Sequence, residues 1–412
     1  MAACCEDNEH DPKAKSIEEA LEIILASSEP LRESEWLPLD AALDRVLARD
    51  QLAPSPIPAW PNSAMDGYAL RASDGDAPRS VVGSSFAGRP FTGSVAAGEA
   101  IRIMTGAIVP ADCDTVMAQE QAEREGDMVR FTRAIRAGAN VRGIGEDLAQ
   151  GELALPAGTQ LRPSQIGVLA SLGLSEVEVL RRLRVAFFST GDELQPVGRE
   201  LRAGEIYDSN RHSLLALLRR IGVDAIDLGR LPDDPARIGS TLRQAGEAAD
   251  VVITSAGVSV GEADYVAELL QSEGTVQFWK MNMKPGRPLA FGRIGRANFF
   301  GLPGNPVSTI VTFYQFVAPA LRKRMGCRAP WTAPRLRLPC ATAVKKKPGR
   351  TDFQRGRLLV GPDGLQVTPV KAQSSHILTG MAQAECFLVL SADAGDLPAG
   401  SLVDVQLLEG MV

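Results

Sequence analysis

The amino-acid sequence predicts a multidomain α/β plus β protein. An α/β domain with a mainly parallel sheet is expected between a β-rich lobe and a small C-terminal β-barrel or sandwich. The chain has 412 residues, which is too long for one ordinary core and suggests about two to four domains. Strand-like apolar runs alternate with helical patterns between 183 and 320, whereas short apolar segments separated by turn residues fill 52–146 and 330–412.

Composition and charge exclude several classes of protein. Hydrophobic residues make up 45% of the chain and charged residues 23%, as in soluble globular proteins. The formal net charge of −6 argues against a general affinity for nucleic acid or anionic membranes. The first fifteen residues contain acids and no apolar core of signal-peptide length, and no run of about 18 apolar residues occurs. We therefore expect a cytoplasmic protein with no nucleic-acid partner and no membrane partner.

Cysteine and histidine usage argues against a zinc site or a disulfide framework. The chain has six cysteines without a C-x-x-C pair, and it has only three histidines. Cys113, Cys327, Cys340 and Cys386 are interpreted as small core residues in a reducing compartment. Any bound metal should therefore have oxygen ligands.

The N-terminal part of the chain begins with a helix and then changes texture. A capping-box motif followed by apolar residues at helical spacing predicts a helix at 16–27. Between 52 and 146, clusters of Gly, Pro, Asn and Asp separate short apolar segments, which indicates a β-rich lobe. A second helix is predicted around 160–174, with Ser164 as its N-cap and Gly173 as its stop.

The middle of the chain alternates strands with helices. Buried strands are predicted at 183–189, 224–228, 251–254 and 298–302. Helices are predicted at 209–220, 263–271 and 307–322. Asn305 suits the N-cap of the last helix and Pro306 its first position. This alternation implies a parallel sheet covered by helices on both faces.

The loops that follow the predicted strands carry acids and small residues. In parallel sheets such loops meet at the carboxyl edge, where ligands bind. The acids there are Asp192, Glu193, Asp233, Asp234, Glu262 and Asp264. Magnesium prefers carboxylates together with water and phosphate oxygens, so the sequence predicts a divalent cation at this edge. The alternative left open is a set of solvated loop acids that cap helices.

The stretch VVITSAGVSVGEADYV, residues 251–266, combines an anion site with two carboxylates. A backbone exposed between Gly257 and Gly261 would offer amide hydrogens to a phosphate. Glu262 and Asp264 follow at once and would repel that phosphate. A divalent cation between them removes the conflict. We expect Asp264 to be the metal ligand and Glu262 to cap the helix that follows.

Basic residues form the counterpart of these acids. Between 275 and 297 the chain contains Lys280, Lys284, Arg287, Arg293 and Arg296 and no acid. The two lysines flank a Met-Asn-Met segment before a Pro-Gly turn and are suited to hold an anion, whereas Arg293 and Arg296 are interpreted as solvated. A second basic cluster lies at 345–357 and is followed by two serines at 374–375. Both are left open between a ligand contact and an exposed barrel loop.

Several catalytic motifs are absent from the sequence. It contains no Walker P-loop, no G-x-G-x-x-G after a strand and no G-x-S-x-G elbow. It also offers no obvious covalent nucleophile with a base. Catalysis by positioning, charge neutralisation and metal assistance remains.

Eight motifs, taken in order, resemble those of the molybdopterin molybdenumtransferase family, which is also represented by the E domain of gephyrin. They are PNSAMDGYA (61–69), RIMTGAIVPADCDTV (102–116), GANVRGIGEDL (138–148), STGDEL (189–194), GEIYDSN (204–210), SAGVSVGEADYV (255–266), KMNMKPGRP (280–288) and GLPGNPVS (301–308). The resemblance covers nearly everything from about residue 15 to the end. One departure is Ala256, where the family usually has a second glycine.

The resemblance implies a four-part subunit that forms a homodimer. The parts are a discontinuous helical linker domain at 14–51 and 147–182, an inserted β-rich lobe at 52–146, a three-layer α/β molybdopterin-binding domain at 183–329 and a C-terminal β-barrel at 330–412. In the family, the active cleft lies between the α/β domain of one subunit and the lobe of the other. Asp66 and Thr105 could therefore serve the same site as the sheet loops.

The resemblance also implies a reaction, in which adenylylated molybdopterin and molybdate yield molybdenum cofactor and AMP with Mg²⁺. The implied catalytic positions are Asp66, Thr105, Asp147, Glu193, Asp264, Lys280 and Lys284. The expected substrate contacts are Ser189, Thr190, Gly191, Ser255, Gly257, Ser259, Gly261, Pro303, Gly304, Asn305, Pro306, Arg355 and Ser375. We hypothesise that Glu193, Asp233 and Asp264 hold the magnesium against the pyrophosphate. The neighbours Asp234, Arg350 and Ser374 stay open as alternatives to Asp233, Arg355 and Ser375.

Two other functions are kept beside this one. A molybdopterin adenylyltransferase shares the α/β domain but lacks the lobe and the barrel. A non-catalytic scaffold for cofactor assembly is similar to the clustering role of the gephyrin E domain, although this chain has no fused second enzyme. If the chain inserts molybdenum, we also expect transient contact with other molybdenum cofactor biosynthesis proteins.

Overall fold

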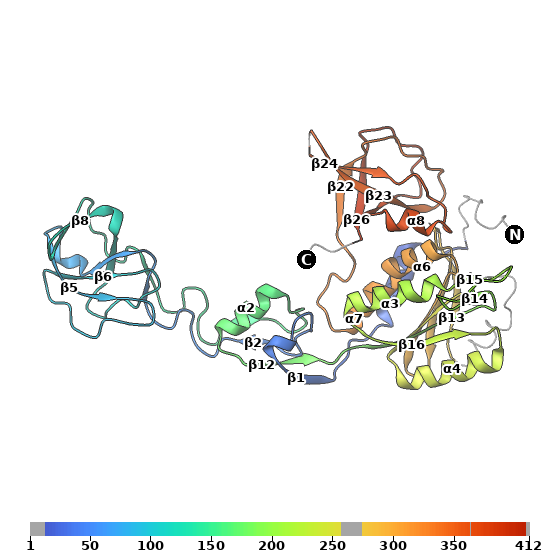
Figure 1. Ribbon diagram of the computed structural model, residues 1–412, viewed down its shortest axis with the longest axis horizontal. Coiled ribbons are helices and arrows are strands. Elements are labelled where there is room, and N and C mark those ends of the chain that lie inside the picture. Colours follow the sequence, from blue (N-terminus) through green and yellow to red (C-terminus); the bar gives the residue numbers. More distant parts are fainter. Residues whose placement is uncertain (1–12, 257–273, 363, 409–412) are drawn as a thin grey trace. The chain divides into compact units, whose positions relative to one another are not determined.

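The computed structural model describes residues 13–256, 274–362 and 364–408 (Figure 1). The chain divides into two compact units. The main unit comprises Met1–Glu35, Asp44–Ala48 and Val179–Val412, and the inserted unit comprises Trp36–Leu43 and Arg49–Glu178. Each unit has its own core and is described by itself. The predicted four-domain boundaries stay a prediction.

The main unit is built on a six-stranded sheet with the order β16-β13-β17-β21-β20-β18. Its parallel strands are β13 (Arg184–Thr190), β16 (Asp224–Leu231), β17 (Val251–Ser255) and β21 (Ala297–Leu302). The antiparallel strands are β18 (Gln277–Lys280) and β20 (Pro288–Ile294). The predicted mainly parallel sheet is confirmed. The two antiparallel strands were not predicted, because basic residues interrupt the apolar pattern of the 275–297 segment.

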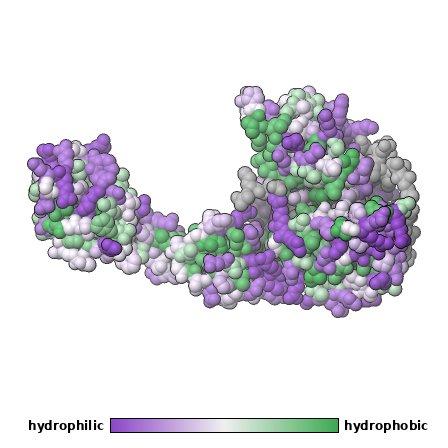
Figure 2. Space-filling view, in the orientation of Figure 1, coloured by the Kyte–Doolittle hydropathy of each residue, from purple (hydrophilic) through white to green (hydrophobic). Residues whose placement is uncertain are grey.

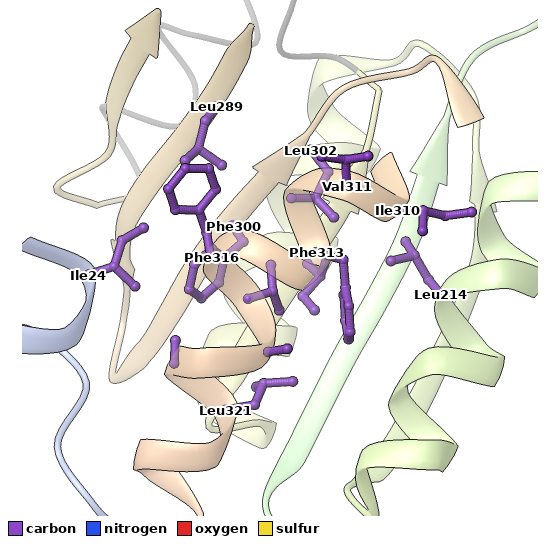
Figure 3. Close-up of a cluster of buried hydrophobic side chains, with 14 of the residues drawn as sticks. Ile24, Leu214, Leu289, Phe300, Leu302, Ile310, Val311, Phe313, Phe316 and Leu321 are labelled. Carbon is purple, nitrogen blue, oxygen red and sulfur yellow. The ribbon is translucent and has the colours of Figure 1, made fainter. Parts of the chain in front are cut away.

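Helices cover both faces of this sheet, as the alternation predicted. They are α1 (Ile17–Ala26), α3 (Ser209–Ile221), α4 (Pro235–Ala248), α6 (Pro306–Thr312) and α7 (Ala318–Arg324), with a π-helical turn at Phe313–Val317 between the last two. Neighbouring strand residues alternate between the faces, so Phe187 and Phe300 join one apolar cluster while Phe188 and Phe299 join the other. Figure 3 shows Phe300 in one apolar cluster with Phe313 and Phe316 of the π-helical turn on the first face.

The predicted helices match the observed ones with some corrections. The helix expected at 16–27 is α1, and its capping box is present. The helix expected at 307–322 is interrupted by the π-helical turn. Helix α4 was not predicted, although Asp234 caps it and Pro235 opens it. The helix expected at 263–271 lies outside the described residues.

The C-terminal part of the main unit is a second six-stranded sheet. Its strands are β22 (Arg335–Pro339), β23 (Thr351–Gly361), β24 (Gly364–Pro369), β25 (Cys386–Leu390) and β26 (Leu402–Leu407), with β19 (Met283–Lys284) at one edge and the short helix α8 (Leu378–Ala382) beside it. The order is β19-β23-β25-β26-β22, with β24 paired to β23. Outside the strand pairs, isolated bridges join Cys340 to Val367 of β24 and Val344 to Leu397. The sheet forms a half-barrel, and the predicted C-terminal β-barrel is not confirmed.

The inserted unit contains the β-rich lobe that the sequence predicted. Its sheet has the order β7-β4-β6-β5-β9-β8, formed by β4 (Gly67–Leu70), β5 (Arg79–Ser85), β6 (Glu99–Ile103), β7 (Thr115–Ala118), β8 (Ala122–Glu125) and β9 (Met128–Phe131). Short 3-10 turns occur at Leu39–Ala41, Ala72–Asp74 and Gln119–Gln121. The lobe core includes Ala69, Ile101, Ile103 and Val116.

The linker segments are less helical than expected. They carry the short strands β1 (Ser34–Pro38), β2 (Gln51–Leu52), β11 (Leu153–Leu155) and β12 (Glu176–Leu180). In the 52–146 segment, β3 (Asn62–Ser63) pairs with the sequence-distant β10 (Val141–Arg142). Helix α2 (Pro163–Ser171) is present. Its N-cap is Arg162 instead of Ser164, because Pro163 occupies the first helical position. Gly173, with φ +76°, follows the helix end as predicted. A helical linker domain is not confirmed.

The exposed surface and the cysteines agree with the composition. Figure 2 shows mainly hydrophilic side chains on the visible face of each unit, with hydrophobic residues in small groups. Cys113, Cys340 and Cys386 are buried and unbridged as expected, whereas Cys327 is unbridged but only half-buried. No helix in the described part of the chain is long and apolar enough to cross a membrane.

Candidate functional site

Loops at the carboxyl ends of β13, β16, β17 and β21 form the candidate site of the main unit. Because these strands are parallel, the loops that leave them meet at one edge of the sheet. The segment after β18 and one loop of the C-terminal half-barrel join them through the contacts described below. Most of the predicted site residues of this unit lie in these segments.

The loop after β13 presents two exposed acids, Asp192 and Glu193. Gly191 has φ +141°, and a Cβ atom at this position would lie 2.5 Å from Glu193 Oε2. The glycine therefore lets the Glu193 carboxylate fold back over the backbone. The buried Ser189 hydroxyl, at the end of the strand, donates a hydrogen bond to Asp208 Oδ1 at 3.2 Å.

The loop after β16 contains two neighbouring aspartates that have different roles. Asp234 Oδ1 accepts hydrogen bonds from Ala236 N at 2.9 Å and Arg237 N at 3.4 Å, so this side chain caps α4. Asp233 is exposed, and its N–H donates to Asp192 Oδ1 at 3.3 Å. No described residue bonds the Asp233 carboxylate, which leaves it available. This geometry favours Asp233 over Asp234 as a ligand.

The predicted magnesium ligands are only partly described. Glu193 and Asp233 are exposed carboxylates whose oxygens suit Mg²⁺. Asp264, the third expected ligand, lies outside the described residues, as do Gly257, Ser259, Gly261 and Glu262. Among the residues that the structure describes, no group of three acidic, histidine or cysteine side chains could hold a metal ion. The magnesium site stays a prediction.

Ala256, the described residue that follows β17, lies against the end of β21 and the loop after it. Ala256 N donates to Leu302 O at 3.1 Å, and a Cβ atom on Gly304 would lie 3.5 Å from the Ala256 Cβ. Ala256 has φ +73°, a left-handed conformation that disfavours residues other than glycine by about 1 kcal/mol. The resemblance puts a glycine at this position, and the backbone keeps that conformation with alanine.

The lysines expected to hold an anion, Lys280 and Lys284, precede a turn that packs on α6. Gly286 has φ +100°, and a Cβ atom there would lie 2.7 Å from Thr312 Oγ1 of this helix. Lys284, half-buried, pairs in register with Asp352 of β23. Lys280 has an exposed side chain, and its carbonyl accepts a hydrogen bond from Lys15 N at 2.8 Å.

The start of α6 contacts the C-terminal half-barrel through Ser375. Val307 N donates to Ser375 O at 3.1 Å, and Asn305 Nδ2 donates to Ser375 Oγ at 3.3 Å. Asn305 occupies the N-cap position as predicted, but its side chain makes no capping bond. Ser374 Oγ lies 2.8 Å from His376 Nδ1 instead. Ser375 is therefore the serine that adjoins the Pro303–Pro306 loop.

Arg355 is buried, with 1% of its surface exposed. Its Nη2 donates to Ala372 O at 3.0 Å and to Ser374 O at 3.2 Å. Burial lowers the pKa of the guanidinium to about 10, so the group is still charged at neutral pH. The structure thus shows Arg355 holding the loop that carries Ser375, while a direct substrate contact stays a prediction. Arg350 is also buried.

Asp66 and Thr105 form a pair in the inserted unit. Asp66 Oδ1 accepts hydrogen bonds from Thr105 N at 2.7 Å and Thr105 Oγ1 at 2.8 Å. Both bonds hold the pKa of this carboxyl below its ordinary value. The bond from the Thr105 backbone N–H has the larger effect and the bond from the hydroxyl the smaller one. Asp147 is exposed in the same unit, and its N–H donates to Ile57 O at 3.0 Å.

Two residues that the sequence reasoning did not single out lie at the start of α3. Asp208 Oδ1 accepts from Arg211 N at 3.1 Å, so Asp208 caps the helix while it also holds Ser189. Asn210 Nδ2 donates to Ser255 Oγ at 2.9 Å and to Gly304 O at 2.7 Å. The aspartate before a helical run could have been recognised as a cap. The asparagine gives no local signal, because its partners are distant in sequence.

Three family models match the chain in order. The MoeA N-terminal region (domain I and II) matches residues 15–173, the probable molybdopterin binding domain matches 186–323, and the MoeA C-terminal region (domain IV) matches 337–408. The segments correspond to the β-rich part, the parallel α/β sheet and the C-terminal half-barrel. The fold and its sheet-edge loops therefore define a multidomain protein of the MoeA type.

Relatives and solved structures agree with this class. The chain is 43% identical to a molybdopterin molybdenumtransferase of Haemophilus influenzae, over 91% of this chain and 94% of that one. It is 33% identical to a gephyrin of Dictyostelium discoideum, over 95% of this chain and 62% of that one. A crystal structure of a molybdopterin biosynthesis moeA protein from Pyrococcus horikoshii OT3 matches with a TM-score of 0.84 and 28% identity, covering 96% of this chain and 100% of that one. The chain belongs to the molybdopterin molybdenumtransferase family.

Proposed function

We propose that this protein inserts molybdenum from molybdate into adenylylated molybdopterin, releasing AMP and forming molybdenum cofactor. The observation that supports it most is the set of loops at the carboxyl edge of the parallel sheet, which carry exposed carboxylates and small residues, together with the Pro-Gly turn that follows Lys284 and packs on α6. A site for several anions needs both kinds of charge. The names of the relatives support a role in molybdenum cofactor biosynthesis.

The chain's own residues supply positioning and charge. Lys280 and Lys284 neutralise molybdate and the pterin phosphate, whose negative charges otherwise oppose approach. The loop of Pro303, Gly304, Asn305 and Pro306 receives the substrate together with Ser375. Arg355 keeps that serine in place through its bonds to the neighbouring carbonyls. Positioning of this kind is worth several kcal/mol of barrier lowering in enzymes generally.

The available carboxylates fit a magnesium ion. Glu193 and Asp233 are the described ligands of the proposed set, and Asp264 completes it. The fit rests on exposed oxygens with no described hydrogen-bond donor, which is the donor chemistry that Mg²⁺ prefers. Magnesium, when bound, lowers the negative charge of the pyrophosphate that is cleaved. Asp234 takes no part, because it caps α4.

We also propose that the protein acts as a homodimer, in which Asp66 and Thr105 of one subunit serve the sheet-edge site of the other. Both side chains are accessible in the lobe, and the two hydrogen bonds from Thr105 hold the pKa of Asp66 below its ordinary value. We assign Asp147 to the same site as Asp66 and Thr105. A cytoplasmic location and transient contact with other molybdenum cofactor biosynthesis proteins belong to this proposal.

The test is direct measurement of the products. Purified protein is incubated with adenylylated molybdopterin, Mg²⁺ and molybdate, and AMP is quantified over time. We expect AMP to appear only when molybdate is present and to stop when a chelator is added. No molybdate-dependent AMP, or ATP consumption with free molybdopterin instead, would point to the adenylyltransferase function.

A further inference from the structure

Asn210, the second residue of α3, connects the end of β17 with the loop after β21. Its Nδ2 atom donates one hydrogen bond to Ser255 Oγ at 2.9 Å and another to Gly304 O at 2.7 Å. Ser255 ends β17 and Gly304 lies in the loop after β21. One side-chain amide therefore spans two neighbouring strands at the edge where the proposed substrate binds.

The orientation of this amide follows from its partners. A backbone carbonyl is only an acceptor, so the group that faces Gly304 O must be the NH₂ group of Asn210. Asn210 Oδ1 is buried and has no partner among the residues that the structure describes. The helix beneath is anchored by its Asp208 cap and by the buried Leu214 and Leu218. Asn210 therefore projects from a rigid support.

This bond also orients the next peptide unit. The Gly304–Asn305 bond is not among the cis peptides of the described chain, and in a trans peptide the C=O and the following N–H point in opposite directions. Holding Gly304 O toward Asn210 thus directs the Asn305 N–H to the opposite side. No described residue accepts a hydrogen bond from that N–H, and Pro306 has none to offer.

We propose that Asn210 is a positioning residue that fixes the Gly304–Asn305 peptide, so that the Asn305 N–H donates to a phosphoryl oxygen of the substrate. The proposal rests on the proposed function for the identity of that substrate. It assigns to Asn210 an effect on anion affinity through the backbone, without direct contact between the side chain and the substrate.

Substitution by aspartate separates this role from simple space filling. Asn210→Asp keeps the size of the side chain but places a carboxylate against the Gly304 carbonyl, and the two oxygens repel. When the aspartate is protonated, its O–H can donate to Gly304 O and replace the lost bond. The kcat/KM of Asn210→Asp relative to wild type should therefore rise as pH falls. Asn210→Ala cannot show this recovery.

The experiment measures KM and kcat for AMP release, the Kd of AMP with Mg²⁺ by calorimetry, and Tm, for wild type and variants. Asn298 provides a matched control, because it is a buried asparagine at the amino end of β21, away from the carboxyl ends where the site lies. Its Nδ2 also donates to a distant backbone carbonyl, that of Ser27, at 3.2 Å. We expect Asn210→Ala to raise KM and the Kd of AMP about tenfold, which corresponds to one hydrogen bond to a charged group. Asn298→Ala should lower Tm and leave both constants unchanged.

The outcomes separate this proposal from the proposed function. Wild-type protein that binds AMP but releases none from adenylylated molybdopterin contradicts the proposed function, and the Kd series then tests Asn210 alone. Unchanged affinity in Asn210→Ala overturns the inference, as does an Asn210→Asp to wild-type ratio that is flat with pH. Wild-type protein that binds neither AMP nor inorganic pyrophosphate overturns it too, because no anion site is then present.

Discussion

The sheet-edge loops of the main unit and the Asp66–Thr105 pair of the inserted unit are built in different ways. The loops are held by side chains from distant segments, such as Asn210 on Gly304 and Asn305 on Ser375. The pair holds itself, since Thr105 supplies both hydrogen bonds to Asp66. The first arrangement depends on the whole fold of its unit, whereas the second sets the charge of one carboxylate locally. Variants can therefore disturb one region and leave the other intact.

The largest effect is expected at Lys284. Lys284→Gln removes a charge from the anion site, and kcat/KM for AMP release should fall by about 100-fold, in the range that loss of one electrostatic contact produces in other enzymes. Lys371→Gln removes an exposed lysine of the C-terminal half-barrel and should have no effect. Equal activity in the two variants would remove Lys284 from the site.

The neighbouring aspartates after β16 should respond in opposite ways. Asp234→Ala removes the cap of α4, so the free energy of unfolding should fall by about 1 kcal/mol. Asp233→Ala should leave stability unchanged and raise the Mg²⁺ concentration needed for half-maximal AMP release. Urea denaturation and magnesium titration distinguish the two variants. A normal magnesium requirement in Asp233→Ala would contradict its place in the ligand set.

The Asp66–Thr105 pair makes a prediction about pH. Thr105→Val removes the hydroxyl bond and keeps the backbone bond, so the pKa of Asp66 should rise toward the ordinary value of 3.8, while Thr105→Ser should leave it low. Because the folded-state pKa is depressed, the pair's contribution to stability is present above that ordinary value and is lost as pH falls through the lower folded-state pKa. Carbon-detected NMR titration of the carboxyl groups checks this. An unchanged pKa in Thr105→Val would show that the hydroxyl bond is absent in solution.

The smallest effect is expected at Ala256. Ala256→Gly relieves the left-handed backbone at φ +73°, although glycine loses more entropy on folding. The net gain in unfolding free energy should be below about 1 kcal/mol, with AMP release unchanged. A clear loss of stability would mean that the Ala256 methyl group packs against the Gly304 loop more strongly than its backbone conformation costs.

The sequence predicted the parts of the fold that local patterns encode. The four parallel strands are apolar runs, and the helix at 16–27 carries its own capping box. Strands β18 and β20 were missed because their charges lie near the strand ends and conceal the apolar residues between them. The half-barrel shows the same limit, since closure depends on which edges pair and not on strand patterns.

The sequence indicated which residue types form the candidate site, but not the hydrogen bonds that hold its loops in place. The acids of the sheet loops follow from strand ends, whereas the cap that Asp234 places on α4, which favours Asp233 as the ligand, is visible only in the fold. The two Asn210 bonds join residues 45 and 94 positions apart, a distance at which no motif spacing operates. The contact of Arg355 with the substrate stays a prediction, and the bonds of its guanidinium to the backbone of the Ser375 loop could not be predicted from the sequence.

The most direct measurement of the proposed reaction is the stoichiometry of a single turnover. Enzyme in excess is mixed with adenylylated molybdopterin, Mg²⁺ and limiting molybdate, and AMP and protein-bound molybdenum are quantified in the same samples. The proposed reaction predicts one AMP released for each molybdenum incorporated, with no release in the absence of molybdate. AMP release that is independent of molybdate, or molybdenum incorporation without AMP, would contradict it.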